Sequence, residues 1–245
     1  MSEGRLSGMR TLTSFNLSRA FKSLYGLIYL SIGIIIPVIL SVTLSFSLKT
    51  LVNSSIGFSV VLETIPSFIP IAATIGGMGV AYLFSTDRSN GVYEYLIATG
   101  KIRIKDIFLS FSLVTVAIIS ILLAIDIAAI SLLIFFTAPS VLGTILQFFA
   151  VFSIPVAYIS SLLSILAMLS WTAMSKVYPG VNAPGGIGSI IGTIPPLVFL
   201  IAIVQIVRPS DLLLIAGLYS VSLFIILILL LVVVIKRMSN ERMLA

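Results

Sequence analysis

Long stretches without a charged residue constrain this chain more than any other feature of its sequence. No Asp, Glu, Lys or Arg occurs between Lys22 and Lys49, or between Asp126 and Lys176. A membrane-spanning helix needs about 20 consecutive apolar residues, because the hydrocarbon core is roughly 30 Å thick. Only 9% of the residues are charged, whereas a soluble domain carries about 25%. The chain therefore has the composition of an integral membrane protein.

The apolar stretches predict an all-α integral membrane protein that crosses the bilayer six times. We expect one transmembrane domain over residues 1–245, because no stretch is long and polar enough for a soluble domain. The predicted spans are residues 27–44, 65–84, 107–136, 141–171, 186–207 and 212–235.

The distribution of basic residues predicts the orientation of these spans. With six spans, every Lys and Arg except Lys49 and Arg208 falls on the same side as the two termini. Cytoplasmic segments carry an excess of Lys and Arg. We therefore expect a multi-pass protein of the cell membrane with both termini inside the cell.

The residues before the first span predict a short amphipathic helix at the membrane interface. Its apolar face would hold Leu17, Ala20, Phe21 and Leu24. Its polar face would hold Ser18, Arg19, Lys22 and Ser23. A polar tail is the alternative. In the second span, small residues four apart, such as Ala72 and Gly76, predict close approach to another helix.

The sequence offers few groups for chemistry. Without Cys or His it has no thiolate nucleophile and no Cys/His metal site. Asp126 is the single ionisable residue within a predicted span, and we expect it at the outer interface or along a transport path. The glycine-rich stretch 177–189 lacks the Gly-Lys-Ser/Thr ending of a phosphate-binding loop. We therefore expect no enzyme activity, cofactor or metal in this chain.

The most informative polar segment lies between the second and third predicted spans. It begins with Asp87 and Arg88, and Gly91 then allows a sharp turn. Residues 92–98 predict about two turns of helix, which Thr99 and Gly100 end. A short helix flanked by charge suits a groove on a soluble partner. An ordinary solvated loop is the alternative.

This segment resembles the cytoplasmic segment of type-2 ATP-binding-cassette (ABC) exporter permeases. Those proteins have, in order, an acidic-Arg pair, Gly-Thr, Glu, Leu-Leu and Thr-Pro before a basic approach to the next span. The matching residues here are Asp87, Arg88, Gly91, Glu94, Leu96 and Thr99. Val92 replaces the usual Thr and Gly100 the usual Pro.

The resemblance implies a permease subunit coupled to separate ATPase subunits. Two permease copies or homologues would enclose the substrate path in the lipid membrane, and two cytoplasmic ATPases would bind ATP and Mg²⁺. The coupling helix would contact the ATPase through Arg88, Gly91, Tyr93, Glu94, Tyr95 and Leu96. No nucleic-acid partner is expected. A channel or ion-coupled carrier without an ATPase, and a structural membrane subunit of a larger complex, are the alternatives.

Overall fold

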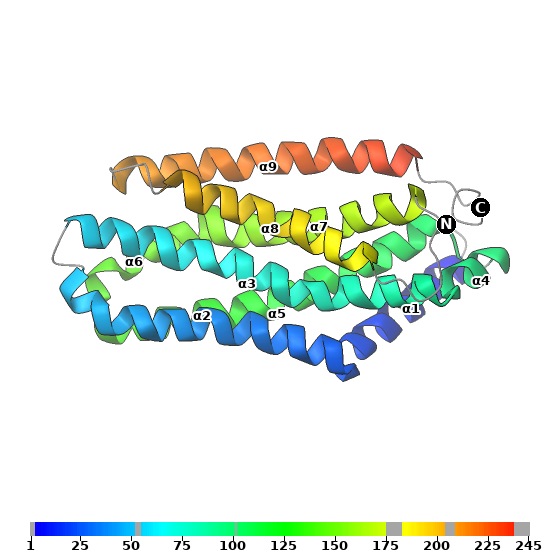
Figure 1. The fold of residues 1–245 in the computed structure, drawn as a ribbon, viewed down its shortest axis with the longest axis horizontal. Helices are drawn as coiled ribbons and strands as arrows, with labels where there is room; N and C mark the ends of the chain where they lie inside the picture. Colours follow the sequence, from blue (N-terminus) through cyan, green and yellow to red (C-terminus); the bar gives the residue numbers. More distant parts are fainter. Residues whose placement is uncertain (1–2, 52–54, 101, 175–182, 204–208, 238–245) are drawn as a thin grey trace.

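The protein is a bundle of long helices (Figure 1). The computed structural model describes residues 3–51, 55–100, 102–174, 183–203 and 209–237, and every element in these ranges is a helix. In chain order they are α1 (Glu3–Lys22), α2 (Leu24–Leu51), α3 (Ser55–Ser89), α4 (Val92–Ala98), α5 (Ile104–Thr137), the 3₁₀ helix η1 (Pro139–Val141), α6 (Leu142–Phe148), the π-helix η2 (Phe149–Ser153), α7 (Ile154–Met174), α8 (Ala183–Ile203) and α9 (Pro209–Arg237).

The long helices run lengthwise, and α3 contacts α2, α5, α7 and α8 (Figure 1). The short helix α4 lies at one end of the bundle, together with α1 and the last turns of α9. We call this the α4 end. The turn between α5 and α6 lies at the opposite end. α1 meets α2 at an angle, so it does not continue the line of the bundle.

Among the described residues, five helical stretches are long and apolar enough to cross a membrane. They are Leu24–Thr43, Thr64–Arg88, Ile104–Thr137, Pro139–Met168 and Asp211–Lys236, and they correspond to five of the predicted spans. The apolar part of α8, Ile190–Ala202, is shorter. Residues 204–207 of the predicted fifth span, and 177–182 of the glycine-rich stretch, lie outside the described residues. The fold is thus all-helical, with the helices of a multi-pass membrane protein.

Small residues bring α2 and α3 close together, as their spacing in α3 predicted. A Cβ atom added to Gly33 would lie 3.2 Å from the Cα atom of Gly76. One turn further toward the α4 end, a Cβ atom on Gly79 would lie 3.2 Å from the Cα atom of Gly26. Such contacts hold helices together in lipid, where the hydrophobic effect between helices is absent.

Proline interrupts the hydrogen-bond ladder of α3 within a candidate membrane span. Pro70 has no N–H group for the carbonyl of Pro66, four residues earlier. The Ser153 hydroxyl donates to that carbonyl oxygen at 2.8 Å. Ser153 is fully buried at the end of the π-helix η2. Because lipid supplies no hydrogen bonds, such rescue by a neighbouring side chain is what allows proline at this depth.

The helix α1 is longer than expected, and its buried face differs from the predicted one. Asn16 and Ala20 are buried, and the Asn16 amide donates to the Ser110 hydroxyl of α5 at 3.3 Å. Phe21 and Leu24, which were predicted to share the apolar face with Ala20, are exposed. The difference arises because α1 packs against α5, a contact that its own periodicity does not specify.

Candidate functional site

Two glycines define the short helix α4 at one end of the bundle. Gly91 precedes it with φ of 69°, and Gly100 follows it with φ of 70°. Both values lie in the left-handed region, which other residues rarely adopt. Between them, Val92–Ala98 forms the helix that the sequence predicted. The chain therefore turns at Gly91, forms the short helix α4, and turns again at Gly100 before α5 begins.

One face of α4 is built into the protein. Tyr93 and Ile97 are buried, and the Tyr93 ring is only 1% exposed. This ring stacks on Phe84 of α3 at a centroid distance of 5.1 Å and meets Phe111 of α5 edge-on at 6.0 Å. Phe84 and Phe111 also contact each other edge-on. The three rings fix α4 against the two long helices.

A buried carboxylate joins α4 to α1. Asp87 accepts a hydrogen bond from the Tyr93 hydroxyl at 2.9 Å and one from Arg19 at 2.7 Å, both on the same oxygen. Burial raises the pKa of the Tyr93 hydroxyl well above its usual range, so the group stays protonated and donates. The hydrogen bond to Asp87 raises the pKa of Arg19. This network ties α1, α3 and α4 together.

A second ion pair holds α4 to the end of α3. Arg88 is almost entirely buried and pairs with Glu94 at 2.5 Å. Burial of one partner makes this pair less dependent on solvent screening than a surface pair. The sequence resemblance assigned Arg88 and Glu94 to a partner contact, whereas the structure pairs them with each other.

The opposite face of α4 is open. Tyr95 is 71% exposed, Val92 is also exposed, and Leu96 is half-buried. These three residues share one face because they are three and four positions apart. Of the six residues that the resemblance assigned to a partner contact, Tyr93 instead points into its own chain, and Tyr95 points outward.

Arg19 is the residue of this site whose role sequence reasoning missed. On the helical projection it fell on the polar face of α1, with Lys22. In the structure it binds Asp87 and lies 5.3 Å from the centroid of the Phe15 ring. A signal was present in the sequence, because an acid at the end of an apolar span needs a cation on the same side of the membrane.

Asp126 lies deep inside the bundle, on the buried face of α5. Its exposure is 0%, and it shares this face with Leu122 and Ile130. Neither carboxyl oxygen has a hydrogen-bond partner in the described part of the chain. The sequence suggested the outer interface or a transport path for Asp126, and the structure places it on the face by which α5 packs into the bundle.

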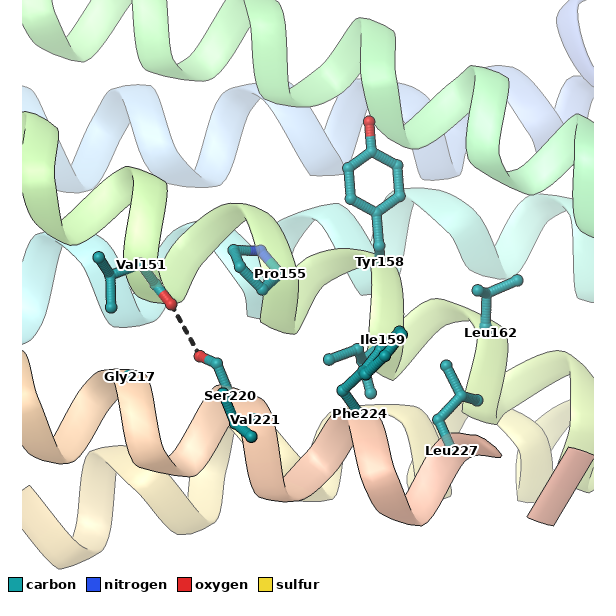
Figure 2. Close-up of a pocket in the computed structure, with 10 residues that line it drawn as sticks. All are labelled: Val151, Pro155, Tyr158, Ile159, Leu162, Gly217, Ser220, Val221, Phe224 and Leu227. Atoms are coloured by element: carbon teal, nitrogen blue, oxygen red, sulfur yellow. Dashed lines mark hydrogen bonds between the residues drawn. The ribbon is translucent and has the colours of Figure 1, made fainter. Parts of the chain in front are cut away.

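An apolar groove lies between α7 and α9, next to the π-helix η2 (Figure 2). Its volume is about 470 Å³, and its lining includes Pro155 of α7 and Phe224 of α9. Because Pro155 lacks an N–H group, the Val151 carbonyl loses its helical partner, and the Ser220 hydroxyl donates to it at 2.9 Å. Tyr158 points away from the groove, and its hydroxyl pairs with Ser120 of α5 at 2.7 Å. The polar groups around the groove are thus paired within the protein.

The described residues contain no group of three or more acidic, Cys or His side chains that could hold a metal ion. Comparisons with protein-family models, curated proteins and solved structures found no match for this chain. The site is therefore defined by its own geometry: a rigidly anchored helix that presents an apolar face at one end of a membrane bundle.

Proposed function

We propose that this chain is the membrane-spanning permease subunit of an ABC exporter and that α4 is its coupling helix. The observation that carries the proposal is the division of α4 into two faces. Tyr93 anchors one face in the bundle, and Tyr95 on the other face is open to a partner. The resemblance of residues 87–100 to the corresponding segment of type-2 ABC permeases agrees with this division.

The proposal includes six spans with both termini in the cytoplasm. α8 is the additional span: its 21 residues correspond to about 31 Å of helix, which matches the hydrocarbon thickness. The α4 end is the cytoplasmic end, since Arg88 and Lys105 flank α4 in the chain and Arg19 pairs with Asp87 there. This assignment follows the excess of basic residues in cytoplasmic segments.

In this proposal, two permease copies form the path and two cytoplasmic ATPases drive it. The exposed face with Val92 and Tyr95 fills a groove on each ATPase. Force passes from α4 through the Tyr93 and Asp87 contacts to α3, α5 and α1. ATP and Mg²⁺ are bound by the ATPases, and substrate in turn affects hydrolysis, because coupling between sites is reciprocal.

The test of this function is the Tyr95→Ala variant. We expect it to fold normally but to bind the ATPase about thirtyfold more weakly, because a buried interface aromatic contributes on the order of 2 kcal/mol. Pull-down of the ATPase and substrate-stimulated hydrolysis measure the effect.

The matched control for Tyr95→Ala is Phe136→Ala. Phe136 is an aromatic residue that is 74% exposed at the opposite end of the bundle, and its loss should leave ATPase binding unchanged. Equal binding by wild type and Tyr95→Ala would contradict a coupling role for α4. Glu94→Lys is a poorer test, because a lysine there would face Arg88 and disturb α4 itself.

The topology has a separate test by cysteine labelling, which the absence of native cysteines makes clean. Single cysteines at Ser2, Asn90 and Ala245 should react with a membrane-impermeant reagent only after the cytoplasmic side is opened. A cysteine at Asn53 should react in intact cells. Labelling of position 90 from outside would reverse the orientation and remove α4 from the cytoplasm.

A further inference from the structure

Asp126 is a buried acid whose surroundings supply no compensating group. It is fully buried in α5, and neither carboxyl oxygen has a hydrogen-bond partner among the described residues. It lies about 20 residues beyond Asp106, which is about 30 Å along the helix. The whole stretch Ile104–Thr137 is a candidate membrane span. The carboxyl group is therefore enclosed by the helix bundle, within a candidate membrane span and out of contact with bulk water.

Among the side chains that the structure describes, the helices packed against α5 bring no charge to the level of Asp126. The Leu122 side chain lies against Gly76 of α3, and Asp126 is one turn further from the α4 end. The apolar stretches Leu24–Thr43 and Pro139–Met168 contain no charged residue. Two groups of titratable side chains are described on the helices packed against α5. Tyr158 pairs with Ser120 through its hydroxyl. The others lie toward the α4 end: Arg10, Arg19, Lys22, Tyr25, Tyr29, Tyr82, Asp87 and Arg88.

An isolated carboxylate in such a place is unfavourable, because it loses its hydration and gains no partner. Ionisable residues inside membrane spans pair with another group or lie on a path for ions. We propose that Asp126 binds a single proton inside the bundle, which neutralises its carboxyl group; an alkali cation would need further oxygen ligands beside this carboxyl group. This site is separate from α4, and the inference does not depend on an ATPase partner.

The experiment uses the purified full-length protein in detergent. The melting temperature is measured in choline buffer over a range of pH, and then with added Na⁺ or K⁺ at fixed pH. The melting temperature of wild type should fall as the pH rises above the pKa of a free carboxyl group, because the unfolded chain then releases the proton that the folded protein holds, and added Na⁺ or K⁺ should not restore it. Asp126→Asn, which keeps the shape of the side chain, should abolish this response. Asp211→Asn, at an exposed acid in the first turn of α9, should retain it.

Infrared spectroscopy distinguishes the proton from the alkali cation without relying on a variant. A bound proton gives the carbonyl stretch of a protonated carboxyl group at neutral pH in wild type, and this band should be absent from Asp126→Asn. A cation response without the band would contradict the bound proton and identify an alkali cation instead. Absence of both the band and the cation response in wild type would overturn the proposal. The proposal would also be overturned if Asp126→Asn folds and gives the same band and the same melting response as wild type.

Discussion

Truncation of Tyr93 to alanine is expected to destabilise the protein by about 4 kcal/mol, the usual cost of removing a buried aromatic side chain. The ring is packed between Phe84 and Phe111, and its hydroxyl binds Asp87. Tyr93→Phe keeps the ring and removes only a hydrogen bond to a charged group, so it should cost about 2 kcal/mol. Thermal unfolding in detergent, followed by size-exclusion chromatography, measures both.

Tyr95 provides the internal control for this prediction. It lies two residues away on the same helix but is 71% exposed, so Tyr95→Ala should change stability by less than about 0.5 kcal/mol. The two variants should therefore separate stability from partner binding, since Tyr95→Ala affects only the latter. Equal destabilisation by the two truncations would show that α4 is not anchored by one face.

Gly26→Ala is expected to lower the free energy of unfolding by about 3 kcal/mol, at the upper end of the usual cost of overpacking. A Cβ atom at this position would lie 2.0 Å from the carbonyl oxygen of Ala20. The obstacle is backbone, so no side-chain rotation relieves it, and the angle between α1 and α2 must change. Gly79 of α3 also approaches Gly26 on this side. The measurement is again the melting temperature in detergent.

The matched control is Gly143→Ala in the short helix α6. No atom lies within 4 Å of a Cβ added at Gly143, so alanine should be neutral or stabilise the helix by up to about 1 kcal/mol. If Gly26→Ala and Gly143→Ala have the same melting temperature, the α1–α2 junction is not as tight as the structure has it.

Local features of the sequence were enough to predict α4. Gly91 and Gly100 flank the helix at Val92–Ala98, and their effect depends only on the backbone freedom of glycine at those positions. The positions of the five long apolar helices were predictable for a similar reason. Whether a stretch can cross a membrane depends on the sum of its own residues and on its length.

The contacts between helices were not predictable in this way. Arg19 and Asp87 are 68 positions apart, and a helical projection of α1 alone cannot show that they pair. In the π-helix η2, the Ser153 hydroxyl donates to the Pro66 carbonyl of α3, and the Val151 carbonyl accepts from the Ser220 hydroxyl of α9. Each of these pairings depends on which helix faces which.

The sequence by itself therefore determined that this protein is helical, that it has the spans of a membrane protein, and where the short helix α4 begins and ends. The tertiary structure decided that Tyr93 is buried and Tyr95 exposed, and that Asp126 faces the interior. The physical reason is that lipid is as apolar as the interior of the bundle. A stretch such as Ile104–Thr137 is apolar on every side, so hydropathy does not indicate which residues face neighbouring helices. Shape, glycine contacts and a few polar pairs decide it.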